Sequence, residues 1–262
     1  VGATADFGPS QSPCGGADGF DECHDEKNDM NFPPLTRASL VRRHKRFLAD
    51  VMLTEDGTPV CAHCPNTGAM SGCQTAGSAV WLSYHDNLKR KLPWTWELVE
   101  TETGLACIHS ARANDVVEEA LRDGHFPSLV PADAELRREV KIAEGSRADF
   151  FIPADGGLYM EVKSVSLHCG DGAGAFPDAV SARATKHLVE LQAAMQRGHR
   201  AALVFAVLHA GIDRVSAAAH IDPTYALALR QAMANGLEVY TLLNDITVGG
   251  IYPVAAHGWD TR

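Results

Sequence analysis

The stretch that decides the fold reads Arg147-Ala-Asp-Phe-Phe-Ile152, then a short break rich in Asp and Gly, then Leu158-Tyr-Met-Glu-Val-Lys-Ser-Val165. The two apolar runs predict two short strands joined by a turn over residues 153–157. Because side chains alternate between the faces of a strand, Glu161 and Lys163 point to the same side. A buried carboxylate without a partner is costly. The charges on these strands therefore indicate a cation, a metal ion or a catalytic role.

Asp149, Glu161 and Lys163 form the pattern that a divalent-metal phosphodiesterase site requires. The two carboxylates would hold Mg²⁺ or Mn²⁺, and the lysine would orient water or stabilise the phosphoryl charge. Glu139, on the strand predicted just before them, would add a further carboxylate and metal ligand. The alternative is a surface ion pair on a sheet edge, which contributes little and needs no metal. We favour the metal site.

Two other segments are placed to contribute to the same edge. Glu118 or Glu119, on the first predicted helix, would supply another carboxylate. Lys186 and His187, near the start of a long predicted helix, are positioned to reach the edge.

The order of elements around this stretch predicts the second domain, over residues 105–262. Expected in turn are a helix over 110–123, a strand over 138–142, the two strands quoted above, a helix over 178–197, a strand over 201–208, a helix over 224–235 and a strand over 237–243. The run over 201–208 is apolar throughout, as in a strand buried on both faces. This order predicts an α/β/α sandwich around a mixed sheet. It matches the restriction-endonuclease-like core, whose PD-(D/E)xK motif has an acid on one strand and (D/E)-x-K on the next.

The first domain, over residues 30–104, is predicted to be a small β-barrel. Several short strand candidates are separated by turns that contain Gly, which is typical of an OB-like barrel. We therefore expect a mixed α+β chain, with this barrel preceding the nuclease-like domain. Two basic clusters in the barrel would contact DNA: Arg42, Arg43, Lys45 and Arg46, and Lys89 with Arg90. A solvated charged face explains such clusters equally well, and the tryptophans nearby are expected in the core.

Composition sets limits on the class of protein. The chain has 262 residues and a net charge of −10, but seven acidic residues and one basic residue fall in the first 30. Residues 1–29 are predicted to be a disordered acidic extension. No apolar run approaches the roughly 20 residues of a membrane span, and no secretory signal is expected. Seven cysteines at irregular spacing favour reduced thiols in the cytoplasm. At Cys61-x-x-Cys64, buried thiols are favoured over zinc, because no matching second pair follows.

Six stretches of the chain carry a family resemblance. They are Arg43-x-Lys45-Arg46-Phe47-Leu48-Ala49-Asp50, His63-Cys64-Pro65-Asn66-Thr67-Gly68-Ala69-Met70, Glu161-Val162-Lys163-Ser164-Val165, Phe176-Pro177-Asp178-Ala179-Val180, Lys186-His187-Leu188 and Phe205-Ala206-Val207-Leu208-His209. In combination they resemble the sugar fermentation stimulation protein (SfsA) family over residues 30–245. The acidic residues 1–29 fall outside the resemblance.

The resemblance implies a cytosolic bacterial or archaeal protein with an OB-like domain followed by a PD-(D/E)xK nuclease-like domain. It implies binding to nucleic acid, to DNA in the first place, and a role in regulating sugar (maltose) metabolism. A divalent-metal nuclease acting on DNA or RNA is the alternative. By position, Asp149, Glu161 and Lys163 are the nuclease-motif residues and Glu139 is their companion. No membrane partner is expected, and a homo-oligomer is left open.

A small-molecule metabolic enzyme has no motif in its favour. The sequence contains neither a Gly-rich phosphate loop nor a nucleophile elbow.

Overall fold

The computed structural model describes residues 1–2 and 30–259 of the chain. The predicted disordered extension over residues 1–29 therefore lies, but for its first two residues, outside the described residues. Within the described ranges, no helix combines the length and the apolar character that a membrane crossing requires.

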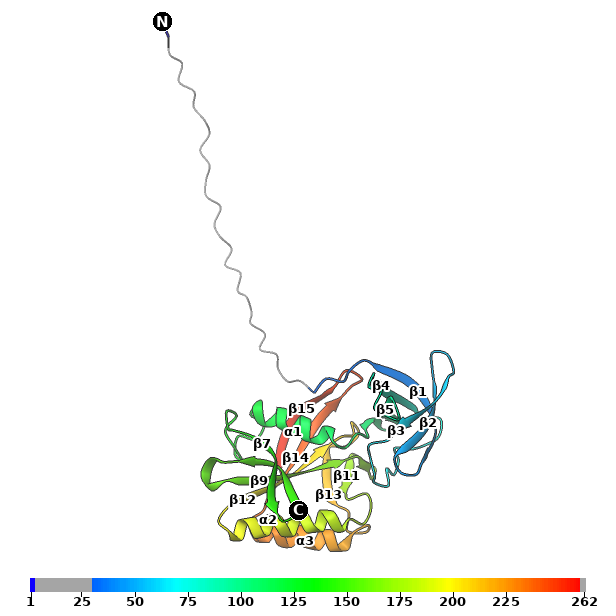
Figure 1. The fold of residues 1–262 in the computed structure, drawn as a ribbon. Coiled ribbons are helices and arrows are strands. Elements are labelled where there is room, and N and C mark those ends of the chain that lie inside the picture. Colours follow the sequence, from blue (N-terminus) through cyan, green and yellow to red (C-terminus); the bar gives the residue numbers. More distant parts are fainter. Residues whose placement is uncertain (3–29, 260–262) are drawn as a thin grey trace.

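The first domain is a closed β-barrel, as the sequence predicted (Figure 1). Its strands are β1 (Leu35–His44), β2 (Leu48–Leu53), β3 (Pro59–His63), β4 (Ala79–Tyr84) and β5 (Trp94–Thr101), with β6 (Gly104–Cys107) added beside β5. They hydrogen-bond in the order β3-β2-β1-β4-β5-β6, and the pairing of His63 with Thr95 between β3 and β5 closes the barrel. The first sheet thus extends past residue 104, to Cys107.

Side chains that alternate between the inside and the outside of the barrel along each strand form its core. Ala38 and Leu40 on β1 face inward with Val80 and Leu82 on β4, and all four are almost fully buried. Trp96 is fully buried, which confirms the prediction that this tryptophan belongs to the core. An inward side chain of this kind contributes roughly 1.5–3 kcal/mol by its burial. These inward side chains form the apolar core of the barrel.

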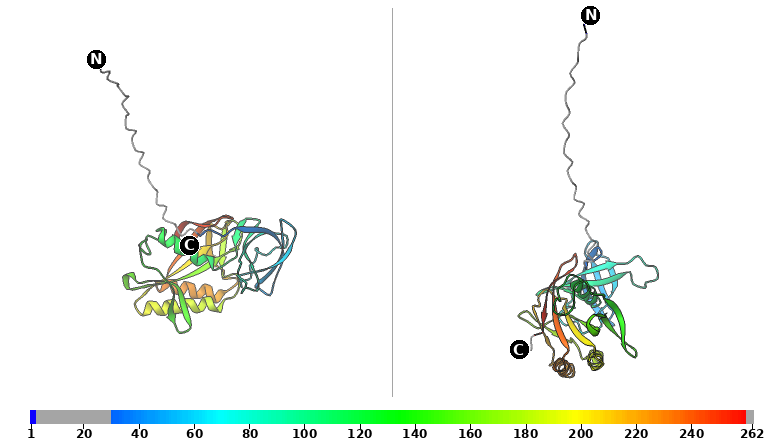
Figure 2. Two further views of the ribbon diagram at one scale, coloured as in Figure 1. Left: turned by 45° about the horizontal axis from the view of Figure 1, so that its top comes forward. Right: turned by 90° about the vertical axis from the view of Figure 1, so that its left-hand side faces the viewer.

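The second domain is a six-stranded mixed sheet between layers of helices (Figures 1 and 2). Its elements are α1 (Arg112–Arg122), β7 (Arg137–Ala143), β8 (Ser146–Ile152), the short 3₁₀ helix η1 (Ala154–Gly156), β9 (Leu158–Val165), α2 (Ala182–Gln196), β12 (Arg200–Val207), α3 (Pro223–Ala234), β14 (Glu238–Ile246) and β15 (Ile251–Gly258). The strand order is β15-β14-β12-β9-β8-β7. Helix α1 covers one face, and α2 and α3 lie side by side on the other.

Strand β12 shows why the sheet sits between two layers. Ala202 and Val204 pack into the core on the α1 side, and Leu203 and Phe205 pack into the core on the side of α2 and α3. A continuous apolar run fills both faces at once, as the sequence predicted for residues 201–208. A smaller sheet of β10 (Leu167–His168), β11 (Ala173–Phe176) and β13 (Arg214–Ala217) follows the end of β9.

The start of α2 was predicted wrongly. The helix begins at Ala182, where the Ser181 Oγ accepts a hydrogen bond from the Ala184 N–H. Asp178, expected to open the helix, instead accepts a hydrogen bond from the Met70 N–H at 3.0 Å. A capping residue type predicts a helix start only when no partner from elsewhere in the fold takes its side chain.

The sequence also missed several strands. Strand β15 is an edge strand whose residues are mostly part-exposed or exposed, so it lacks the clear apolar alternation of a half-buried strand. Strands β6, β10, β11 and β13 have only two to four residues, too few for a periodic signal.

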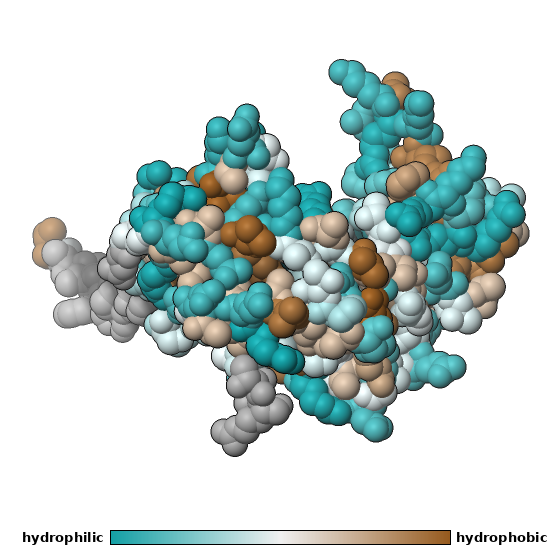
Figure 3. All heavy atoms as spheres, turned by 90° about the horizontal axis from the view of Figure 1, so that it is seen from below, coloured by the Kyte–Doolittle hydropathy of each residue, from teal (hydrophilic) through white to brown (hydrophobic). Residues whose placement is uncertain are grey.

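Helices α2 and α3 present a face without a broad apolar patch (Figure 3). Exposed apolar side chains such as Val189 on α2 and Leu227 on α3 are scattered among polar ones. Isolated exposed apolar residues are normal for a folded domain.

Candidate active site

Asp149 lies where strands β8 and β9 separate. The ladder between them ends at the pair formed by Phe150 and Met160. One residue further on, the Asp149 Oδ2 accepts a hydrogen bond from the Val162 N–H at 2.7 Å, and its Oδ1 accepts one from the Asn114 Nδ2 at 2.9 Å. The side chain thus takes the place of a backbone acceptor, and two elements, β9 and α1, fix its carboxylate.

Glu161 and Lys163 lie on the same face of β9, as their spacing predicted. The Lys163 Nζ donates to the Glu161 Oε1 at 2.5 Å, and His187 on α2 is bonded to the same oxygen through its Nδ1. Glu161 is only 5% exposed. Its burial is therefore compensated by two basic side chains rather than by solvent.

Both ring nitrogens of His187 have polar partners. The Arg183 Nε lies 3.4 Å from the His187 Nε2, and a guanidinium can only donate. The Nδ1 contacts the Glu161 Oε1 and lies 3.3 Å from the Lys163 Nζ, so the ring joins Arg183, Lys163 and Glu161 in one polar network. Helix α2 places Arg183 and His187 one turn apart, so Arg183 contacts the ring that binds Glu161 on β9.

The two carboxylates have opposite electrostatic environments. Burial and the nearby charge of Glu161 raise the pKa of Asp149, against the lowering effect of its hydrogen bonds to Val162 and Asn114. Burial also pushes the pKa of Glu161 upward, but the contacts with His187 and Lys163 outweigh it and leave this pKa lowered. Two acidic groups that repel each other in a buried site fit a divalent cation, and oxygen donors suit Mg²⁺, Mn²⁺ or Ca²⁺.

A cleft of about 760 Å³ opens over this site. Asp149 and His187 line it, whereas Glu161 and Lys163 are not among its lining residues. The other polar lining residues are Glu139, Lys141, Ser146, Arg147, Arg183 and Lys186. Basic side chains therefore outnumber acidic ones around the opening, which favours an anionic ligand.

The predicted additional carboxylates have different positions. Glu139 lines the cleft from β7, is exposed, and has a positive φ of 54°. Glu118 is paired with Arg122 and Arg138, and Glu119 accepts a hydrogen bond from the Met30 N–H. Glu139 therefore shares the cleft with Asp149, whereas both glutamates of α1 are bonded elsewhere.

The first basic cluster divides into paired and exposed residues. Arg42 is bonded to Asp50 at 2.8 Å. Arg43 donates to the backbone carbonyls of Arg46, Asn66 and Gly68. Lys45 and Arg46 are exposed in the turn between β1 and β2, both with positive φ. The turn therefore presents two cations without an ion-pair partner among the described residues, whereas Arg43 is part-buried and Arg42 is exposed but paired with Asp50.

The second basic cluster follows β4. Lys89 is exposed, and the Arg90 Nη2 donates to the Thr95 Oγ1 at 2.8 Å. Beside it, Tyr84 and Trp94 form an edge-on aromatic pair with ring centroids 4.9 Å apart, and Tyr84 is half exposed. Basic and aromatic side chains therefore occur together on this part of the barrel.

Sequence reasoning missed Asn114 and most of the basic rim. Asn114 is a polar residue inside α1, and no local pattern connects it to a strand 35 positions later. Three of the basic residues around the cleft belong to no recognisable motif: Lys141, Arg147 and Arg183. They line the cleft because β7, β8 and α2 converge there.

Comparisons with known proteins agree with this two-domain arrangement. Residues 111–249 match the family description "Sugar fermentation stimulation protein RE domain", and residues 41–108 match "SfsA N-terminal OB domain". The chain belongs to the sugar fermentation stimulation protein family. Within the SfsA family, the structure of Pyrococcus furiosus SfsA in complex with Ca²⁺ has the same fold. It matches with a TM-score of 0.78 and 24% identity, over 88% of this chain and 98% of that one.

Proposed function

We propose that this SfsA-family protein binds DNA and hydrolyses its phosphodiester bonds with a divalent cation. One observation carries the proposal. Asp149, Glu161 and Lys163, from two neighbouring strands, converge beneath a cleft whose opening is rich in basic side chains. Acidic ligands for a metal beneath a cationic rim for phosphate are what hydrolysis of a nucleic-acid backbone requires.

Each residue has a role in this proposal. Asp149 and Glu161 would hold Mg²⁺ or Mn²⁺, with Glu139 as a further ligand at the mouth of the cleft. The bound ion would supply Lewis-acid polarisation of the phosphate and acidify a water molecule. Lys163 would orient that water or stabilise the charge that develops on the phosphate. His187 and Lys163 hold the Glu161 Oε1 in the structure, so metal binding there exchanges basic partners for the ion.

The solved relative supports the choice of a divalent cation. It is an SfsA in complex with Ca²⁺, an ion that oxygen ligands bind. Mg²⁺ is usually bound through one or two carboxylates together with substrate phosphates, so Mg²⁺ or the similar Mn²⁺ is proposed as the activating ion.

The barrel is proposed as the DNA-binding module. Its turn between β1 and β2 exposes Lys45 and Arg46, and Tyr84 lies half exposed beside Trp94. Basic side chains for the backbone and aromatic rings for bases are the usual combination on OB folds. A regulatory role in sugar metabolism comes to this chain from the family resemblance, and DNA binding is the step that such a role requires.

The decisive experiment compares cleavage of single- and double-stranded DNA by the purified full chain with and without Mn²⁺. Asp149→Asn should reduce the rate about 100- to 1,000-fold, because it removes a charge that holds the metal. The matched control is Asp171→Asn, an exposed aspartate in the turn between β10 and β11. This control should cleave like the wild type.

The same experiment distinguishes a nuclease from a protein that binds DNA without cleaving it. Cleavage that survives Asp149→Asn would refute the catalytic proposal. Tight DNA binding by wild type and variant alike, with no cleavage at any metal concentration, would leave a DNA-binding protein as the function.

A further inference from the structure

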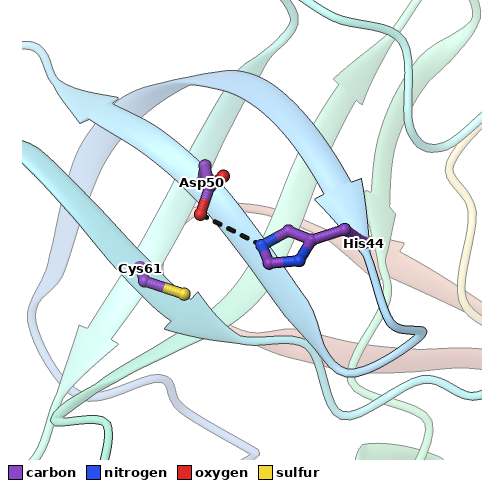
Figure 4. Close-up of side chains that lie close together, drawn as sticks. All are labelled: His44, Asp50 and Cys61. Carbon is purple, nitrogen blue, oxygen red and sulfur yellow. Dashed lines mark hydrogen bonds and ion pairs between the residues drawn. The ribbon is translucent and has the colours of Figure 1, made fainter.

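A second cluster of metal-ligating side chains lies on the barrel, away from the cleft. His44 at the end of β1, Asp50 on β2 and Cys61 on β3 come from three adjacent strands (Figure 4). Asp50 is the registered neighbour of both Arg42 on β1 and Cys61 on β3. Since His44 is two residues from Arg42, its side chain projects from the same face of the sheet.

The distances suit one small cation. The donor atoms of the three residues all lie within 4.8 Å of one another, and the His44 Nε2 is 3.1 Å from the Asp50 Oδ1. Around a tetrahedral zinc ion, nitrogen or oxygen ligands at about 2.0–2.2 Å and sulfur at about 2.3 Å are separated by roughly 3.3–3.6 Å. Side-chain adjustments of about 1 Å therefore suffice to close the site.

The donor set selects the class of metal. Imidazole, thiolate and one carboxylate are ligands of zinc and similar borderline ions, whereas Mg²⁺ and Ca²⁺ prefer oxygen alone. Each of the three side chains is partly exposed, so solvent can supply the fourth ligand. The Arg42 Nε, at 2.8 Å from the Asp50 Oδ2, holds the second carboxylate oxygen and leaves Oδ1 facing His44.

The arrangement does not suit a cysteine nucleophile. Asp50 lies between Cys61 and His44 in the sheet, so the imidazole is bonded to the carboxylate rather than to the thiol. Burial and the charge of Asp50 raise the pKa of Cys61, whereas a reactive cysteine needs a lowered one. A bound metal ion would instead deprotonate the thiol directly.

We propose that His44, Asp50 and Cys61 form a binding site for a zinc-class divalent cation that joins strands β1, β2 and β3. The site lies at the base of the turn that exposes Lys45 and Arg46. Its occupancy would therefore stabilise this corner of the barrel. The site has no signature in the sequence, because its three ligands come from neighbouring strands rather than from two Cys pairs. Cys64, the partner of Cys61 in the Cys-x-x-Cys motif, is buried.

The test is a cobalt titration of the reduced full chain after removal of metals with a chelator. Co²⁺ reports a cysteine ligand through thiolate-to-metal charge-transfer absorption, and Zn²⁺ should bleach the signal. One equivalent should saturate the site. Cys61→Ser should abolish the charge-transfer band, and His44→Gln should weaken binding by more than the roughly 10- to 100-fold typical of losing an outer-shell partner.

Matched controls separate this site from the other cysteines. Cys23→Ser, in the segment outside the described residues, and Cys169→Ser, an exposed thiol of the second domain, should both retain the signal. A charge-transfer band that persists in Cys61→Ser, or no band in the wild type, would overturn the proposal.

A second measurement guards against misfolding of a variant. Zn²⁺ should raise the Tm of the wild type by more than that of Asp50→Asn, which keeps the shape of the side chain and loses its charge. An equal rise in both proteins would count against the site.

Discussion

At the scale of single residues, the carboxylates of the candidate active site depend on partners that are distant in the sequence. Asp149 is held by Asn114 from α1 and by the backbone of β9, and Glu161 by His187 from α2. Each contact orients an oxygen that a metal would need. The Asp149 carboxylate is therefore oriented before any ion binds, which lowers the cost of binding at that residue.

Asn114→Ala tests this organisation. The variant loses a hydrogen bond that favours the ionised form of Asp149, so the pKa of Asp149 should rise further above its ordinary value. Mn²⁺ affinity at neutral pH should fall about 10-fold or more, as for the loss of an outer-shell partner. The free ion can be followed by electron paramagnetic resonance. Asn235→Ala, at the exposed end of α3, is the control, and unchanged affinity in Asn114→Ala would contradict the role given to this residue.

At the scale of elements, the hairpin of β1 and β2 separates basic residues that look equivalent in the sequence. Arg42 and Arg43 are bonded within the barrel, whereas Lys45 and Arg46 occupy the turn. Charge available for phosphate is therefore concentrated at the tip of the hairpin. The prediction that all four contact DNA remains untested, and the structure suggests a ranking among them.

This ranking of the four basic residues predicts how the salt dependence of DNA binding changes when the residues at the hairpin tip are replaced. The double variant Lys45→Ala/Arg46→Ala should bind DNA more weakly and lower the slope of log affinity against log salt by about 2, since each phosphate contact on duplex DNA contributes roughly 0.9. Fluorescence anisotropy over a salt series measures both quantities. Arg230→Ala, an exposed arginine on α3, should change neither. An unaltered slope in the double variant would exclude the hairpin tip from the interface.

At the scale of the whole molecule, buried polar contacts join the two domains. Glu97 on β5 is fully buried and accepts hydrogen bonds from Ser83, His109 and Arg112. Arg112 opens α1, the helix that also carries Asn114. The barrel is thus linked through Glu97 to the helix that positions Asp149.

A glycine makes a second junction possible. A side chain at Gly68 would place its Cβ 2.4 Å from the Asp178 Oδ2, so a larger residue there would displace this carboxylate from its present position. Asp178 then accepts a hydrogen bond from the Met70 N–H, and this bond connects the loop to the segment before α2.

The first of these links predicts a pH-dependent stability. Burial raises the pKa of Glu97, but the contacts with His109 and Arg112 outweigh it and lower the pKa to about 2 from 4.5. This difference corresponds to roughly 3 kcal/mol at neutral pH. Because the folded-state pKa is the lower one, the contribution is fully present above about pH 4.5 and is lost as the pH falls toward 2.

Glu97→Gln should therefore lower the Tm at pH 7 by roughly 6–12 °C and flatten its decline between pH 4.5 and 2. Thermal unfolding followed by circular dichroism across this pH range measures both effects. Glu100→Gln, an exposed glutamate on the same strand, should behave like the wild type. Parallel acid profiles for Glu97→Gln and the wild type would contradict the assignment.

Local pattern in the sequence was enough to predict most of the helices and strands. The apolar run of β12, the alternation on β9 and the turns of the barrel depend on neighbours along the chain, so they predicted strands, both domains and the shared face of Glu161 and Lys163. Where a side chain found a distant partner, as Asp178 did with Met70, the local prediction was wrong.

Tertiary structure alone decided how the charges are distributed. The fold brings Glu161 into contact with His187, which lies 26 residues away in the sequence. It also brings together the basic residues around the cleft from three elements. It places His44, Asp50 and Cys61 on adjacent strands. The physical reason is that hydrogen bonds, ion pairs and metal ligation act over a few ångströms in space, whereas the periodicity of a sequence reports only which side of its own element a residue faces.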